Sequence, residues 1–172
     1  MPERRVAPTA IEVIAETPAA LRALLHGLPR GALEAPVDDG WSTKDVVAHL
    51  LDANSVAFTN RIRRMLAEDR PLIKPIDPSA RLKEQDYASW PLDRLLNDFE
   101  RVRGEDVELL RGLSGQEMAR AGEHAEAGEI TVSDLAHYCA VHDMMHLQQI
   151  ARMLLTQIAG SVGNMGRYIN QP

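Results

Sequence analysis

The fold is decided by one stretch, TVSDLAHYCAVHDMMHLQQIARMLLTQIA, which spans residues Thr131–Ala159. Its apolar residues recur at steps of three and four, which is the spacing of one face of an α-helix. Thr131 and Asp134 at its start form a T-x-x-D variant of the capping box, and Gly160 follows the last periodic residue. The stretch therefore predicts a single long helix.

Three earlier segments show the same helical spacing of apolar side chains: Thr9–Leu28, Ser42–Glu68 and Pro91–Leu113. Pro18 lies inside the first of them, and a proline in a helix interior removes one backbone hydrogen bond. We therefore expect a kink or a fresh start near Thr17. Aromatic residues are only 4% of the chain, which favours helices packed on helices over a β-sandwich. Together the four segments predict an all-α fold, a four-helix bundle.

A long connector, Asp69–Trp90, separates the second and third predicted helices and shows no convincing periodicity. It is long enough to run back along the second helix, roughly 40 Å at 1.5 Å per residue, so these two helices could run parallel. The other connections, residues 29–41 and 114–130, are rich in turn-forming residues. With 172 residues and no repeat, the chain is expected to form one domain over residues 1–172.

Composition and charge narrow the function classes. The formal net charge is −6, and no basic cluster is interleaved with aromatic residues, which disfavours nucleic-acid binding. Cys139 is the only cysteine, so an intramolecular disulfide and a cysteine-based zinc site are excluded. Residues Met1–Ala10 lack the apolar core of a signal peptide, and no run of roughly 18 apolar residues occurs. We expect a soluble, cytoplasmic protein without a membrane span.

The fourth predicted helix carries polar residues on a face that should be apolar: His142, His146 and Gln149. Two histidines four residues apart lie about 40° apart around a helix, so their rings can converge on one metal ion. His49 is the best candidate for a third ligand, because it is expected to point inward and bundle sites form between facing helices. Three neutral imidazoles leave coordination positions open, as in catalytic zinc sites.

We therefore predict a divalent metal ion on His49, His142 and His146, zinc or nickel first, with iron or manganese as alternatives. The competing interpretation is structural, because an inward histidine is often a hydrogen-bonded core residue and such a pair often lies on a solvated face. Spacing alone leaves both open. No Ser/His/Asp or Cys/His nucleophilic set and no phosphate-binding glycine loop is evident, so no catalytic residue is assigned.

Three segments resemble the DinB/YfiT-like superfamily: GWSTKDVVAHLLDAN (Gly40–Asn54), PLDRLLNDFERVR (Pro91–Arg103) and GEITVSDLAHYCAVHDMMHLQQIARMLL (Gly128–Leu155). Members of this family are four-helix bundles whose metal triad takes one histidine early in helix two and an HxxxH pair in helix four. The resemblance implies that His49, His142 and His146 are that triad. It also implies an up-down-down-up helix order and a homodimer.

Three histidines on a divalent ion lower the pKa of a water or a thiol, so two enzyme functions are predicted. One is hydrolysis of a small molecule. The other is attack of a low-molecular-weight thiol, such as bacillithiol or mycothiol, on an electrophile. The resemblance favours this second function, because several relatives look like thiol S-transferases or thiol-dependent isomerases. The rival function is a non-catalytic, metal- or ligand-binding bundle in a stress response, and the sequence leaves the choice open.

Further acidic and amide residues receive narrower predictions. Asp45 is expected either to cap the second helix or to accept the second N–H of His49. Gln149 is a candidate contact for a water on the ion. Asp52 and Asp106 are each either a general base or a residue on the flank of its helix.

The remaining candidates are expected to lie outside the site. Asp143 projects about 100° away from the histidine before it, so it should face solvent or bridge to another helix. His137 should face another way, and Cys139 should behave as a small buried hydrophobe. His26 and His124 are expected in loops or on the surface.

Overall fold

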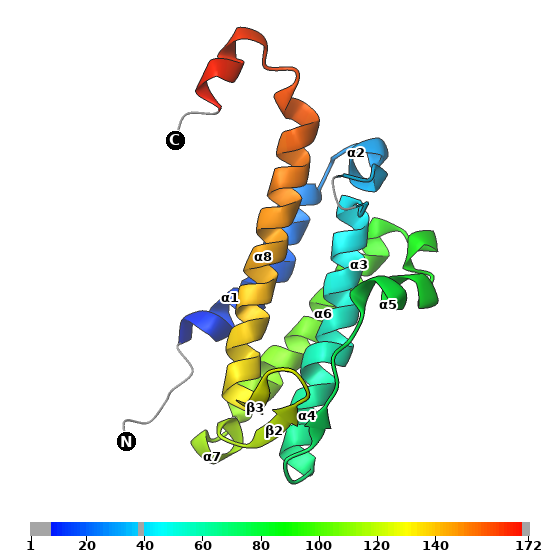
Figure 1. Cartoon of the computed structure of the whole chain (residues 1–172). Helices are drawn as coiled ribbons and strands as arrows, with labels where there is room; N and C mark the ends of the chain where they lie inside the picture. Colours follow the sequence, from blue (N-terminus) through cyan, green and yellow to red (C-terminus); the bar gives the residue numbers. More distant parts are fainter. Residues whose placement is uncertain (1–7, 38–39, 170–172) are drawn as a thin grey trace.

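The computed structural model describes residues 8–37 and 40–169, and its main elements are four long helical segments (Figure 1). These are α1 (Pro8–Leu25), α3 (Thr43–Ala53) continued by η1 (Asn54–Thr59) and α4 (Asn60–Ala67), α6 (Leu92–Gly112) and α8 (Val132–Ala159). The predicted four-helix bundle is confirmed. The prediction that residues Met1–Ala10 do not form a signal peptide stays untested, because residues 1–7 lie outside the described residues.

Contacts along the helices define their directions. Lys44, near the start of α3, donates a hydrogen bond from Nζ to the carbonyl oxygen of Ala88, just before α6, at 2.8 Å. Further along both helices, the hydroxyl of Thr59 lies 2.7 Å from Oδ2 of Asp106. The second and third helical segments therefore run parallel, and Figure 1 shows α1 and α8 running the opposite way. This arrangement places α3 opposite α8.

The first helix differs from its predicted bounds of Thr9–Leu28. It ends earlier, and Gly27, which follows, takes a left-handed conformation with φ 77° that does not continue a helix. The expected fresh start near Thr17 is wrong, because α1 is continuous through Pro18. The hydroxyl of Thr17 donates to the carbonyl oxygen of Val13 at 2.8 Å. The short helix α2 (Arg30–Glu34) follows in the connection to α3.

The second predicted helix, Ser42–Glu68, is interrupted by the π-helical segment η1. Asn54 at its start is fully buried and donates from Nδ2 to Oδ2 of Asp106 at 2.7 Å. The hydroxyl of Thr59 lies 2.9 Å from the carbonyl oxygen of Asn54, five residues back. Apolar periodicity does not distinguish one π-turn from an α-turn, so the sequence predicts the helix but not the π-helical turn within it.

The two longer connections contain elements that their sequences did not indicate. They are β1 (Leu72–Ile73), α5 (Pro78–Glu84), the 3-10 helix η2 (Tyr87–Ser89), α7 (Gly115–Met118), β2 (Ala121–His124) and β3 (Gly128–Thr131). One sheet has the order β1-β2-β3, parallel in the first pair and antiparallel in the second. Gly122 permits close packing, because an added Cβ would lie 3.1 Å from the carbonyl oxygen of Pro71. The fold is helical with a small added sheet.

Buried apolar residues form two clusters, one toward each end of the bundle. On α8, Cys139 belongs to one cluster and Ile150 to the other, and the buried carboxylate of Asp143 lies between them. Arg103 on α6 and Thr17 on α1 separate the clusters in the same way. We call Thr17, Arg103 and Asp143 the polar layer. Among the described residues, no helix combines the length and the apolar character needed to cross a bilayer.

Candidate metal centre

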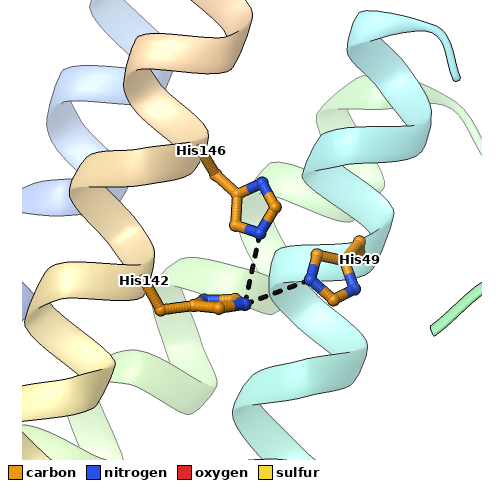
Figure 2. Close-up of side chains that lie close together, drawn as sticks. All are labelled: His49, His142 and His146. Atoms are coloured by element: carbon orange, nitrogen blue, oxygen red, sulfur yellow. Dashed lines mark hydrogen bonds between the residues drawn. The ribbon is translucent and has the colours of Figure 1, made fainter. Parts of the chain in front are cut away.

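Three imidazole rings converge where α3 faces α8 (Figure 2). Nε2 of His142 lies 3.1 Å from Nε2 of His49 and 3.2 Å from Nε2 of His146. Ligand atoms of all three rings lie within 4.8 Å of one another. The structure thus brings together the three residues that the sequence singled out, and their ligation of a metal ion stays a prediction.

Capping boxes fix the starts of both helices that carry these histidines. In α3, Oδ2 of Asp45 accepts from the backbone N–H of Ser42 at 2.8 Å, while Oγ of Ser42 accepts from the backbone N–H of Asp45 at 3.2 Å. In α8, Thr131 and Asp134 make the same reciprocal pair. Capping is therefore the role in which the structure places Asp45.

Gln149 orients one ring of the cluster. Its Oε1 lies 2.7 Å from Nδ1 of His146. An amide oxygen only accepts, so Nδ1 carries the proton and Nε2 presents a lone pair toward His142. Gln149 thus contacts a ring of the cluster, and such a bond fixes the orientation and basicity of a metal-binding histidine. Its contact with a water on the ion stays a prediction. Nδ1 of His142 is buried with no hydrogen-bond partner among the described residues.

The rings of His49 and His142 are partly withdrawn from water, which keeps them neutral. His49 packs against the ring of Trp41 at a centroid distance of 5.2 Å, and His142 packs against Phe58 at 5.3 Å. Burial, with the charge of His146 as the next cause, lowers the pKa of His49 to about 4 and that of His142 to about 3. Both rings are therefore neutral at pH 7, which is the form that binds a metal ion.

Hydrogen bonds among the rings do not account for the whole cluster. Nε2 of His146 is an acceptor, and one proton on Nε2 of His142 can serve only one of its two neighbours at a time. A divalent ion would accept a lone pair from all three rings. Nitrogen ligands of a tetrahedral ion at 2.0–2.1 Å lie about 3.3 Å apart, which is close to the observed 3.1 and 3.2 Å. The donor set fits a divalent metal.

A cavity of about 520 Å³ borders His49 and His142. Its walls come from α3, η1, α4, the connector from β1 to the start of α5, the β2–β3 hairpin and α8. Apolar side chains make up much of the lining, among them Val56, Phe58, Ile76, Ile130 and Leu135. Polar lining residues include Asp52, Arg61, His124 and Tyr138. An apolar pocket of this size with a few polar groups suits a small organic molecule.

The two candidate general bases lie in different surroundings. Asp52 lines the cavity, but its carboxylate accepts hydrogen bonds from Arg81 at 2.8 and 2.9 Å and from Tyr87 at 3.3 Å. Asp106 is not part of the cavity lining and is hydrogen-bonded to Asn54 at 2.7 Å. Burial raises the pKa of Asp106, although its hydrogen bonds lower it. Asp52 is thus restrained by an ion pair, and Asp106 does not line this cavity.

Asp143 faces away from the imidazole cluster, toward α6. Its Oδ1 accepts from Nη2 of Arg103 at 2.8 Å, and the two side chains are 0% and 2% exposed. Burial raises the pKa of Asp143 to about 6, although Arg103 and Thr17 lower it. Of the two expectations for Asp143, solvent exposure is wrong and the bridge to another helix is observed. Nη1 of Arg103 also lies 2.7 Å from Sγ of Cys139. Burial raises the pKa of Cys139 to about 12.

The other histidines occupy three different environments. Nδ1 of His137 lies 2.8 Å from the carbonyl oxygen of Ser133, outside the cluster as expected, and His26 is exposed. The loop or surface position expected for His124 is wrong, because it ends β2, is half-buried and lines the cavity. The position of His124 depends on the pairing of β2 with β1, which no local pattern in the sequence predicts.

Sequence reasoning also missed the cavity roles of Arg61 and Tyr138. Tyr138 lies one turn before His142 on α8, with ring centroids 6.1 Å apart, so helical spacing could have placed it at the site. Arg61 follows η1, whose π-turn changes which side chains face the cavity. Only the structure identifies Arg61 as a cavity residue.

Comparison with known proteins gives the same picture. The family model described as the DinB superfamily matches residues 14–150. A curated relative from Oceanobacillus iheyensis is 31% identical over 114 residues, which cover 66% of this chain and 65% of the relative. Another from Geobacillus thermodenitrificans is 37% identical over 111 residues, 64% of this chain and 62% of the relative. The chain thus spans slightly less than two thirds of the length of these two relatives.

A third relative, "Putative metal-dependent hydrolase YfiT" from Bacillus subtilis, is 28% identical over 149 residues, 84% of this chain and 83% of the relative. A solved structure of YfiT matches with a TM-score of 0.74 at 26% identity, covering 88% of this chain and 91% of that one. It is described as "a probable metal-dependent hydrolase with an unusual four-helix bundle topology". Because the family model spans most of the chain, this protein belongs to the DinB superfamily.

Proposed function

We propose that this chain is a metal-dependent hydrolase of a small organic molecule, with a divalent ion held by His49, His142 and His146. The observation that carries the proposal is the convergence of three Nε2 atoms, at 3.1 and 3.2 Å, beside a cavity of about 520 Å³. The names of the relatives support hydrolysis as the reaction class, because all three contain the words "Putative metal-dependent hydrolase".

A divalent ion bound here supplies Lewis acidity, which lowers the pKa of a water or thiol and polarises a substrate oxygen. The chain's own part is to hold the imidazoles in place, and Gln149 does so for His146 at 2.7 Å. Apolar walls limit bulk water around a substrate and strengthen electrostatic interactions there. Cys139 offers no nucleophile, because it is buried against Arg103. The nucleophile is therefore water or a cosubstrate.

Thiol transfer is the second candidate, and the size of the cavity favours it. A volume of about 520 Å³ far exceeds that of the single water that hydrolysis requires beside its substrate. A low-molecular-weight thiol such as bacillithiol or mycothiol would supply the nucleophile that the chain lacks. The two reactions share one metal site and differ in whether turnover depends on added thiol.

Zinc and nickel remain the expected ions. An all-imidazole donor set suits zinc, nickel, copper and iron, whereas manganese prefers carboxylate ligands. Within the described residues the cluster contains histidines only. Iron is therefore the stronger of the two alternatives, and manganese the weaker.

Metal content and turnover test this proposal together. Purified protein is loaded separately with zinc, nickel, iron(II) or manganese, desalted and assayed by inductively coupled plasma mass spectrometry. We expect one equivalent of ion per chain. Loaded protein is then screened with chromogenic esters, and with a chromogenic electrophile in the presence and absence of each thiol. His146→Ala should lose both ion and turnover with its circular dichroism retained, while His26→Ala, which changes an exposed histidine, should retain both.

Each result assigns the protein to one class. Ester turnover without thiol supports the hydrolase, and strictly thiol-dependent turnover replaces it with the transferase. One bound ion with no turnover in either screen leaves the non-catalytic metal-binding bundle. Absence of a bound ion under metal-replete conditions overturns the proposed site itself.

A homodimer and a cytoplasmic location stay predictions. Helix α8 exposes Val141, Met144 and Met145 to 54%, 53% and 59%, beside a surface groove of about 610 Å³. Apolar side chains grouped on one exposed helix face suit an interface with a second copy. Light scattering should give twice the chain mass of 19.1 kDa, and the mass of one chain would contradict the dimer.

A further inference from the structure

Arg61 differs from most of the described arginines in having no acidic partner. Arg81, for example, lies 2.8 Å from the carboxylate of Asp52. The guanidinium of Arg61 instead donates from Nη2 to the backbone carbonyl oxygen of Lys74 at 2.6 Å. In residues 8–37 and 40–169, no carboxylate lies within 4 Å of Arg61. A carbonyl group is polar but does not neutralise the positive charge.

The position of Arg61 connects this charge to the imidazole cluster. Arg61 lines the same cavity as His49 and His142. It lies about one turn beyond Phe58, whose ring packs against His142 at 5.3 Å. Arg61 is half-buried, and burial lowers its pKa while the nearby Tyr138 raises it. A partly desolvated cation without a counter-ion is unfavourable unless a ligand supplies the negative charge.

The acidic groups on the cavity wall do not supply it. The carboxylate of Asp52 is paired with Arg81. Asp134 accepts from the backbone N–H and the hydroxyl of Thr131 at 2.9 and 2.7 Å in the capping box of α8. Glu126 is exposed on the β2–β3 hairpin. An anionic ligand in the cavity therefore finds Arg61 as a cation that no described carboxylate has neutralised.

We propose that Arg61 binds a carboxylate group of the substrate, and that this substrate is a small carboxylic acid with an apolar body. The inference rests on the proposed function, because it assigns a specificity-determining residue to the same cavity. A planar guanidinium matches the geometry of a carboxylate, and hydrogen bonds between charged groups are the strong ones. The apolar walls, including Val56, Ile76 and Leu135, suit the hydrocarbon part of such a molecule.

Matched pairs of acids and amides test this inference. The probes are phenylacetate, 3-phenylpropionate and 4-phenylbutyrate, each compared with its primary amide by isothermal titration calorimetry on zinc-loaded protein. We expect at least one acid to bind about 10- to 100-fold more tightly than its amide, which is the range for a hydrogen bond to a charged group. Arg61→Gln should abolish this preference without weakening the binding of the amide.

Two further variants separate charge recognition from support of the cavity wall. Arg61 holds the connector through Lys74, so a purely structural role would weaken acid and amide alike. Arg61→Lys keeps the charge and should retain part of the preference. Arg63→Gln changes an exposed arginine on the same helix and should behave as the wild type. Equal loss for acid and amide in Arg61→Gln would overturn carboxylate recognition.

A carboxylate could also bind the ion directly, and His146→Ala distinguishes the two. In that variant, prepared free of metal, the preference for acids should persist and should still disappear when Arg61→Gln is added. A preference that requires metal but not Arg61 overturns the inference, and so does wild-type protein with no preference or no measurable binding. Failure of the metal assay alone would overturn the proposed function, while the Arg61-dependent preference for acids would stand on its own measurement.

Discussion

Helix α8 carries two polar sites that are adjacent in sequence and opposite in character. On the side facing α3, the Nε2 atoms of His142 and His146 lie 3.2 Å apart beside the cavity. On the side facing α6, Asp143 is paired with Arg103 at 2.8 Å, and neither side chain is more than 2% exposed. The two charges of the ion pair neutralise each other within the chain, although Nε of Arg103 and Oδ2 of Asp143 have no hydrogen-bond partner among the described residues. In the imidazole cluster the Nε2 atoms face one another and hydrogen bonds among the rings satisfy only part of the contacts, so a bound metal ion would complete it.

Packing around the two sites explains this difference. The polar layer, Thr17, Arg103 and Asp143, lies between two apolar clusters and is shielded from water on every helix that contributes to it. A charge placed there is unfavourable without its partner. His49 and His142 instead border a cavity and carry no charge at neutral pH, so the chain tolerates them without a ligand. One face of α8 therefore contributes to stability and the neighbouring face is available for binding.

We call the Arg103–Asp143 ion pair the closed site and the imidazole cluster the open site. The largest expected loss of stability comes from breaking the closed site. Asp143→Ala leaves Arg103 as a buried cation without its carboxylate, and Arg103 cannot discharge itself at any ordinary pH. Loss of one partner from a buried ion pair lowers the free energy of unfolding by about 3–5 kcal/mol. Urea denaturation of metal-free protein, followed by circular dichroism, measures the change. A loss below about 1 kcal/mol would show that the pair does not stabilise α8 in this way.

A double variant serves as the control for this effect. Arg103→Met combined with Asp143→Leu replaces the pair by apolar side chains, and such exchanges are often neutral or stabilising. The double variant should therefore recover most of the stability lost in Asp143→Ala. If it is as unstable as the single variant, the loss reflects disturbed packing between the apolar clusters rather than an unpaired charge.

A change in the open site should lower metal affinity strongly and the free energy of unfolding only slightly. His142 is central to the cluster, at 3.1 and 3.2 Å from its two neighbours, so His142→Ala removes the ligand on which both contacts depend. Structural zinc sites bind with roughly 10–16 kcal/mol over four ligands, so losing one ligand should cost about 3 kcal/mol, or more than 100-fold in metal affinity. Competition with a chromogenic chelator measures this change.

The same variant also tests the contrast with the ion pair. Removing His142 leaves no buried charge without its partner, so the unfolding free energy of metal-free His142→Ala should fall by only about 1 kcal/mol. A loss comparable to that of Asp143→Ala would mean that the imidazole cluster also stabilises the bundle. The distinction between a closed and an open site would then disappear.

The two sites also differ in how far the sequence predicts them. His142 and His146 stand out because they replace apolar residues at helical spacing, and His49 follows as an inward residue of a facing helix, which the resemblance also implies. Asp143 also occupies a regular helical position, but its burial depends on Arg103, which lies 40 residues away. Arg61 and His124 reach the cavity through a π-turn and a parallel strand pairing. Local periodicity identifies a helix and its inward residues, whereas contacts between distant segments require the assembled fold.

A smaller effect is expected from the residue that orients His146. Gln149→Ala removes the acceptor at 2.7 Å from Nδ1, so the ring loses the bond that fixes its tautomer and orientation. Hydrogen-bond partners of metal-binding histidines typically contribute 10- to 100-fold in affinity or activity. The same chelator competition should show a loss in this range, smaller than for His142→Ala. Gln148→Ala changes the neighbouring exposed residue and should leave affinity unchanged, and equal losses in both variants would exclude this role for Gln149.

The smallest expected effect concerns how rigidly α3 presents His49. Ser42→Ala removes one half of the capping box, which should lower the unfolding free energy by about 1 kcal/mol. Thr131→Ala does the same at the start of α8 and is the matched variant. His49 lies about two turns beyond its cap and His142 about three, and both helices are held by packing there, so metal affinity should change less than tenfold in either variant. A larger loss in Ser42→Ala alone would show that the open site, unlike the ion pair, depends on a helix end rather than on the core.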